Sequence, residues 1–353
     1  MRRRHRLMIP ALACLAVFIP GKGPVRAEPV SGGRGGGAVE SFVSPDELGP
    51  AEGASGPTRP AAVDEAPRPK PKPRPRRRHT PPKPMAPNPA AGTSAVSAPT
   101  AVTYSDWRAL DPASTLVIES GRGRIIVELR PDFAPASVAR VLLLARRGLY
   151  DGLLFHRVID GFVAQTGNPN NHDGGKSDEP NLPPEFSFRL GADTPHVVVA
   201  HQAGDDLGFV GASPYESVGD GRMAASPDHR ITAWGAYCPG VMGMGRDEAP
   251  GSGNSEIFFM RDPARRLERS YSVVGRVVQG LDVIRSLPVG EPPASPERMI
   301  RVRVMADMPQ EERPAIQMLN TKGSEFRALA DRVRAARGAD FSVCDIEIPV
   351  KDR

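Results

Sequence analysis

Residues 155–167 read FHRVIDGFVAQTG, the most informative stretch of this 353-residue chain. The Asp160-Gly161 pair is a turn signal, and β-branched and aromatic residues flank it on both sides. The stretch therefore predicts two short strand segments that carry Arg157 and Gln165. Taken alone, its Phe and Val residues are those of an ordinary β-core.

Two later segments have the same β-rich character. Residues 254–260 read NSEIFFM, and residues 271–284 read YSVVGRVVQGLDVI. The second of these passes from a strand pattern through a Gln-Gly turn into a short helical pattern, which we expect over 281–286.

The surrounding sequence predicts further short strands and one more helix. Strand-like runs at 115–119 and 124–129 flank the turn sequence SGRG, which predicts a hairpin. Pro135 begins a helix with apolar residues at helical spacing, and Gly148 ends it. A last strand is expected over 299–305. This pattern indicates a mainly β fold, a closed antiparallel barrel capped by two helices.

Together, FHRVIDGFVAQTG, SEIFFM and YSVVGRVVQGLDVI resemble the cyclophilin family of peptidyl-prolyl isomerases. The resemblance covers about residues 115–306, apart from a divergent middle. It implies a cyclophilin-like barrel that isomerises X-Pro bonds. It places Arg157 at the family's catalytic arginine and Gln165 at the glutamine beside it.

The same resemblance implies a binding site for Pro-containing segments. Tyr271 stands where a His often flanks the proline pocket, and Val163 replaces a more usual Met. Met244-Gly245-Arg246 matches the strand whose backbone pairs with the substrate peptide. The four pocket positions are Phe162, Val163, Phe258 and Leu267.

Three features depart from the family pattern. Glu256 occupies a catalytic position that is normally Gln. An ionised carboxylate only accepts hydrogen bonds, so Glu256 either pairs with Arg157 and holds it or neutralises part of its charge. Arg266 replaces a frequent Trp. The segment 203–239 is longer than the usual connection, and it could be a lid, a docking loop or inert filler.

Rotation about an X-Pro bond needs no covalent step, so we expect neither a metal nor another cofactor. The sequence has no CxxC or HxxxH pair that would suggest a zinc site. Two functions remain open: an isomerase that acts on exported proteins during folding, and a catalytically weak chaperone or scaffold that binds Pro-containing segments. Arg157 favours the enzyme, whereas Glu256, Gly245 and the long insertion favour the binder.

Residues 1–27 resemble a cleaved secretory signal peptide. They combine a basic start, an apolar run from Leu7 to Ile19 and the exit Val25-Arg26-Ala27. The apolar run is shorter than a bilayer span, so no transmembrane segment is expected after cleavage. We therefore expect export, to the periplasm of a Gram-negative source or otherwise as a secreted protein.

Residues 28–103 lack helix and strand periodicity and are predicted to be a disordered Pro/Arg-rich linker. Within this linker, residues 68–83 hold eight Lys and Arg, and residues 67–76 alternate Pro with a base. They form either a solvated spacer or an arm that rests on an anionic envelope surface. Residues 101–353 hold 30 bases and 34 acids, so the folded part has no basic excess and nucleic acid is not an expected partner.

The remaining chain divides into an isomerase domain over 104–308 and a C-terminal extension over 309–353, and we expect a monomer. The extension contains a predicted helix over 324–337 and an alternating, strand-like pattern over 341–348. Whether it packs on the barrel or on a partner is open. Cys238 and Cys344 could pair in an oxidising compartment, but their separation in sequence says nothing about their distance.

Overall fold

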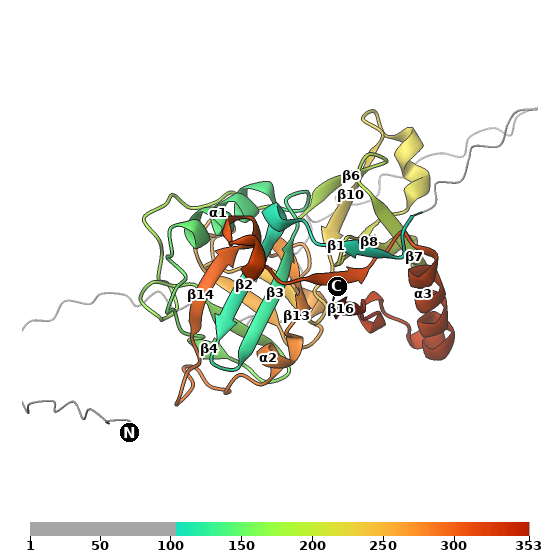
Figure 1. Cartoon of the computed structure of the whole chain (residues 1–353). Coiled ribbons are helices and arrows are strands. Elements are labelled where there is room, and N and C mark those ends of the chain that lie inside the picture. Colours follow the sequence, from blue (N-terminus) through green and yellow to red (C-terminus); the bar gives the residue numbers. More distant parts are fainter. Residues whose placement is uncertain (1–103, 353) are drawn as a thin grey trace, which may run out of the picture. The chain divides into compact units, whose positions relative to one another are not determined.

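The largest sheet of the computed structural model, which describes residues 104–352, holds eight antiparallel strands (Figure 1). It curls around a core, with α1 (Pro135–Arg146) against β14 and α2 (Leu281–Arg285) against β3. The predicted signal peptide and linker lie outside the described residues. In sheet order the strands are β14 (Met299–Val304), β2 (Thr115–Ser120), β3 (Gly123–Leu129), β13 (Val273–Gln279), β11 (Val241–Met244), β12 (Ile257–Met260), β5 (Val163–Thr166) and β4 (Arg157–Val158).

The predicted hairpin is confirmed as β2 and β3, which pair from Thr115 opposite Glu128 to Ser120 opposite Gly123. Both strands read as nearly continuous apolar runs because both of their faces are covered. Side chains such as Leu116 pack into the core under α1, whereas the alternate side chains, such as Val117, pack against the third sheet described below. Period-two alternation places these two sets on opposite faces of one strand.

The predicted helices and the last strand of the eight-stranded sheet are also confirmed. The helix expected from Pro135 ends at Arg146, and the one expected over 281–286 is α2. The C-terminal helix α3 spans Ser324–Arg337. Within residues 104–352, no helix is both long enough and apolar enough to cross a membrane.

The expectation of a closed barrel is wrong, because the eight-stranded sheet is open between β4 and β14. Two isolated bridges, Leu154 with Arg298 and Val158 with Gly290, and a few single backbone hydrogen bonds lie along this gap. The segment 288–298 that faces β4 contains four prolines, which have no N–H to donate to a ladder. The curled sheet is therefore completed by a loop instead of a paired strand.

The segment 203–239, expected to be a lid, a docking loop or filler, instead contributes three strands to a second sheet. This antiparallel sheet packs around a buried aromatic group that includes Phe209 and Tyr215. A six-residue 3₁₀ helix, Asp220–Ala225, connects two of its strands. In sheet order the strands are β6 (Phe188–Gly191), β10 (Arg230–Gly235), β9 (Ser213–Val218), β8 (Asp205–Val210) and β7 (His196–Gln202).

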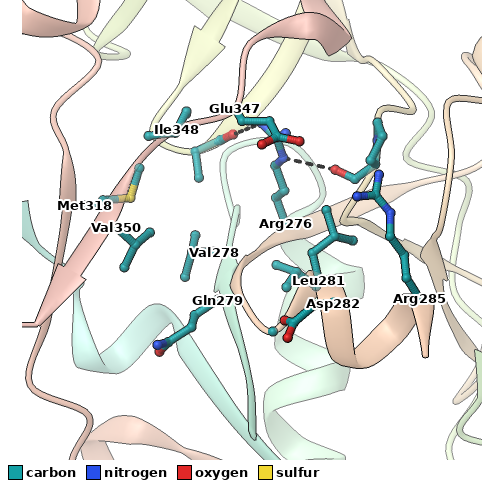
Figure 2. Close-up of a pocket in the computed structure, with 14 residues that line it drawn as sticks. Arg276, Val278, Gln279, Leu281, Asp282, Arg285, Met318, Glu347, Ile348 and Val350 are labelled. Atoms are coloured by element: carbon teal, nitrogen blue, oxygen red, sulfur yellow. Dashed lines mark hydrogen bonds between the residues drawn. The ribbon is translucent and has the colours of Figure 1, made fainter. Parts of the chain in front are cut away.

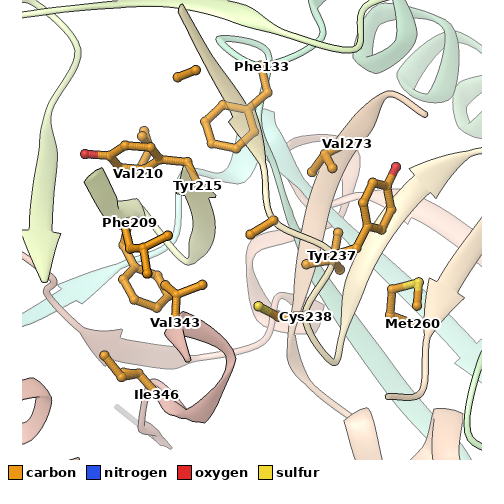
Figure 3. Packing of buried hydrophobic residues seen from close by; sticks show 14 of the residues in the cluster. Phe133, Phe209, Val210, Tyr215, Tyr237, Cys238, Met260, Val273, Val343 and Ile346 are labelled. Atoms are coloured by element: carbon orange, nitrogen blue, oxygen red, sulfur yellow. The ribbon is translucent and has the colours of Figure 1, made fainter. Parts of the chain in front are cut away.

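The C-terminal extension packs on its own chain. Its strand β15 (Ile316–Leu319) lies between β1 (Trp107–Ala109) and β16 (Val350–Asp352) in a third sheet, so both ends of the described chain pair with the same strand. The strand expected over 341–348 is wrong: this stretch contains a 3₁₀ helix, Val343–Asp345. Its alternating apolar residues are buried nevertheless, because the turn points Val343 and Ile346 into the core of the second sheet (Figure 3).

A disulfide joins the extension to the rest of the fold. Cys238 and Cys344, whose pairing the sequence left open, are bonded across 106 residues. Cys238 is fully buried beside Tyr237, whose ring stacks on that of Phe258.

Candidate functional site

A small, mainly apolar pocket gathers seven of the predicted site residues. Its lining comes from β4, β5, β12 and the segment after β12. The seven residues are Arg157, Phe162, Val163, Gln165, Phe258, Leu267 and Tyr271.

Strand register explains why these residues meet. β5 lies between β4 and β12, and Gln165 is directly opposite Arg157 on one side and Phe258 on the other. Directly opposed residues of neighbouring strands project from the same face of a sheet. The sequence FHRVIDGFVAQTG therefore turns back on itself at Gly161, where φ is +63°, and places its Arg and Gln side by side.

Phe258 forms the floor of the pocket. Its side chain is almost fully buried and stacks on Tyr237 with ring centroids 5.8 Å apart. Tyr271 meets it edge-on, at 5.7 Å between centroids. Gly243 lies opposite Phe258 in β11, and a Cβ atom there would lie 2.3 Å from the ring. The absence of a side chain at Gly243 thus makes the space that the Phe258 ring fills.

Arg157 is held at the pocket from two directions. Its Nε donates to Glu291 Oε2 at 2.5 Å, and its Nη1 donates to Gln165 Oε1. Gly290, the neighbour of Glu291, exchanges two backbone hydrogen bonds of 2.9 Å with Val158, the neighbour of Arg157. The bridge between the two backbones therefore aligns the two charged side chains.

Glu291 is a site residue that sequence analysis missed. It lies 134 positions from Arg157 in a proline-rich loop, outside every motif that resembles the family. Half of its side chain is exposed, whereas Arg157 is buried. No local pattern in the sequence marks this pair.

Glu256 reaches Arg157 through Gln165. Gln165 Nε2 donates to Glu256 Oε1 at 2.8 Å, and Asn168 Nδ2 donates to Glu256 Oε2. Burial raises the pKa of Glu256 above its ordinary value, although His156 and these two amides partly oppose the shift. Of the two predicted roles, the contacts favour support for Arg157, because the carboxylate fixes the glutamine that holds it.

One cluster beside this network has metal-ligand chemistry. Ligand atoms of His156, Asp173 and Glu256 lie within 4.8 Å of one another, and an imidazole with two carboxylates is a set that could hold a divalent ion. His156 Nε2 is 3.2 Å from Asp173 Oδ1, and this hydrogen bond lowers the pKa of the Asp173 carboxyl. The contacts among these side chains account for their arrangement without an ion.

The predicted peptide-pairing residues lie next to the pocket and outside its lining. Met244 ends β11, and Gly245 N donates to Glu256 O at 2.8 Å. A Cβ atom at Gly245 would lie 2.5 Å from the Glu256 side chain, so the small residue permits this close approach. The Arg246 guanidinium lies 4.4 Å above the Tyr271 ring and forms part of the rim.

Arg266, where the resemblance led us to note a missing Trp, covers another edge of the pocket. Its guanidinium lies 4.5 Å above the Phe162 ring, a distance at which a cation is attracted to the aromatic face. Two aromatic residues of the pocket lining, Tyr271 and Phe162, are thus each covered by an arginine from outside the lining.

Comparison with known proteins agrees with this geometry. Residues 115–305 match the family model described as cyclophilin type peptidyl-prolyl cis-trans isomerase/CLD. A probable peptidyl-prolyl cis-trans isomerase of Brucella suis is 30% identical over 215 residues, which are 56% of this chain and 86% of that protein. Peptidyl-prolyl cis-trans isomerase B of Bacillus subtilis is 29% identical over 176 residues, 50% of this chain and 90% of its own length.

A solved structure shows the same relationship. The cyclophilin AquaCyp293 from Hirschia baltica is 34% identical, with a TM-score of 0.64, over 70% of this chain and 94% of its own. Fold, pocket and sequence lead to one conclusion: the chain belongs to the cyclophilin-type peptidyl-prolyl cis-trans isomerases.

Proposed function

We propose that this isomerase acts through Arg157, held by Glu291 and Gln165 at the edge of a proline pocket whose floor is Phe258. The observation that carries the proposal is the two-sided anchoring of a buried guanidinium beside an apolar cavity. Such a group is already oriented before substrate arrives, so little reorganisation is needed during the reaction.

The chemistry requires stabilisation of a twisted amide. Rotation about a peptide bond crosses a barrier of about 18–20 kcal/mol, because twisting breaks the amide resonance. The lone pair then localises on the prolyl nitrogen, which becomes a hydrogen-bond acceptor. Arg157 donates to this nitrogen, and the pocket grips the pyrrolidine ring. A 10⁵-fold acceleration needs about 7 kcal/mol of stabilisation that exists only in the twisted state.

Peptide binding is assigned to the end of β11. Met244, Gly245 and Arg246 continue the chain past Tyr271 where this strand ends, and backbone groups there can pair with the residues that precede proline. Gly245 itself is buried and its N–H already bonds Glu256 O, so the pairing is proposed for the other backbone groups of this segment.

The test is the isomerase rate of Arg157→Ala on a proline peptide, with the full chain. We expect most of the acceleration to be lost while the thermal transition stays near that of the wild type. Glu291, the charged partner left behind, is half-exposed and can be hydrated, and the other partner, Gln165, lines the pocket that the removed side chain would open further. A variant with the wild-type rate would disprove the assignment of Arg157.

The alternative function is a chaperone or scaffold that binds Pro-containing segments with little turnover. Glu256 is the observation that favours it, because a buried acid near Arg157 reduces the local positive potential. The same experiment separates the two: a scaffold binds the peptide without accelerating isomerisation, and Arg157→Ala then changes neither property.

We further propose that the protein works on exported proteins after removal of residues 1–27. The leader-like sequence of that segment supports this, and so does the disulfide between Cys238 and Cys344, since such bonds persist in oxidising compartments. N-terminal sequencing of the exported protein should begin at Glu28. Retention of the leader would contradict the proposal.

A further inference from the structure

A second cavity lies at the opposite end of β13 from Tyr271 and the proline pocket. Its volume is about 250 Å³, and it opens between the turn from β13 into α2 on one side and the C-terminal strands on the other (Figure 2). We call it the β13–β16 cavity because both strands line it. Its apolar lining includes Val278, Leu281, Met318, Ile348 and Val350.

Arg276 places a buried positive charge in the wall of this cavity. Only 7% of the residue is exposed, and burial lowers its pKa to about 10, so it stays protonated at neutral pH. Its Nε donates to Pro239 O at 3.3 Å, and its Nη1 donates to Ala212 O at 3.1 Å (Figure 2). These contacts fix the guanidinium but supply no negative charge.

No residue in 104–352 forms an ion pair with Arg276, and its Nη2 has no hydrogen-bond partner there. Buried cations are normally paired with an anion, because removal from water is costly. Glu347 lies at the exposed rim and stabilises the charge through space. Arg285, also exposed on the cavity lining, adds a second guanidinium.

We propose that the β13–β16 cavity binds a carboxylate carried on a small apolar body, with Arg276 as its charged partner. The carboxylate would complete the arginine's hydrogen bonding, and the apolar body would cover Leu281, Met318 and Ile348. Two sources offer this chemistry: the C-terminal carboxylate of a polypeptide that ends in an apolar residue, and a free short-chain organic acid. The inference does not depend on the proposed isomerase mechanism.

Calorimetric titration of the full chain with hexanoate and with hexanamide tests the charge requirement. We expect one hexanoate per chain and no measurable binding of hexanamide, which has the same body without the charge. Proline-peptide turnover should be unchanged at saturating hexanoate, since the proline pocket is a separate site. Equal binding of the two compounds, or inhibition of turnover by competition with the proline peptide, would overturn the proposal.

Variants test the residues. Arg276→Gln should weaken hexanoate binding about tenfold, equivalent to about 1.4 kcal/mol. Glu347→Gln should strengthen it about threefold, because it removes an acid that competes for the same guanidinium. Arg301→Gln, at an exposed arginine on β14 outside the cavity, should change nothing. Wild-type affinity in a folded Arg276→Gln variant would refute the assignment.

Glu347→Gln keeps the proposal testable if Arg276→Gln does not fold, because Glu347 is on the surface. An unchanged or weaker affinity in that variant would refute the proposal. A tripeptide ending in Leu, with a free or an amidated C-terminus, then identifies the source. If the free-acid peptide binds more tightly than hexanoate, the natural ligand is a polypeptide C-terminus; otherwise it is a free acid.

Discussion

Replacement of Phe258 by Ala should both destabilise the fold and weaken peptide binding. Only 4% of Phe258 is exposed, and its ring packs against Tyr237 and Tyr271. Removing a buried Phe ring costs about 3–5 kcal/mol, the loss being smaller where the space can refill. Because one side of this ring faces an open pocket that water can enter, we expect about 3 kcal/mol.

Phe259 provides a matched control. It follows Phe258 on β12 but projects from the opposite face of the strand, where it is fully buried near Phe155. Phe259→Ala should lose about 3–5 kcal/mol of stability without changing the pocket lining. Both variants should therefore lose stability, but only Phe258→Ala should alter the lining of the pocket.

Urea unfolding and proline-peptide affinity, both at low temperature, measure the two effects. We expect Phe258→Ala to bind the peptide at least tenfold more weakly than Phe259→Ala, a difference of about 1.4 kcal/mol. Phe258→Leu and Phe259→Leu repeat the comparison with milder changes, should either alanine variant unfold. If the two positions affect affinity equally, Phe258 is a core residue only, and the pocket assignment fails.

Three other perturbations follow from the same geometry. Glu291→Gln removes the charged partner of Arg157. Because half-exposed ion pairs are worth about 0–1 kcal/mol, kcat should fall about fivefold at most while KM stays unchanged. A change in KM alone would contradict a positioning role. Glu256→Gln should raise the melting temperature at neutral pH. Because the folded-state pKa of Glu256 is raised, the wild-type free energy of unfolding falls as pH rises above about 4.5, and the stability advantage of the variant should grow with it. A stability advantage that does not change with pH would refute this reasoning. Cys344→Ala should lower the free energy of unfolding by about 2–4 kcal/mol, and a reductant should do the same to the wild type but not to the variant, where Cys238 has lost its partner.

The sequence correctly predicted the elements whose defining contacts lie within one short segment. The hairpin of β2 and β3, the helix that begins at Pro135 and the helix α3 were all predicted, because each is specified by turn chemistry and apolar periodicity within one short segment. The seven pocket residues were predicted through the resemblance to a known family, and the structure brings all of them together.

Long-range contacts were decided only by the tertiary structure. Three such features involve segments more than 100 residues apart in sequence. They are the opening of the sheet between β4 and β14, the disulfide between Cys238 and Cys344, and the ion pair of Glu291 with Arg157. The strand expected over 341–348 failed for a related reason. A 3₁₀ helix that packs on the core of the second sheet buries the apolar side chains of this segment. A paired strand would produce the same apolar pattern in the sequence, so the pattern could not distinguish the two structures.

The sequence by itself therefore determined the family and, through the resemblance, the seven residues that line one pocket in the folded chain. It could not determine which charge steadies Arg157 or which cavity encloses Arg276. The sequence gives each side chain's type and its neighbours along the same strand. Its contacts with distant parts of the chain depend on how the whole chain folds. Electrostatic pairing is set by distance in space, and only the folded structure supplies that distance.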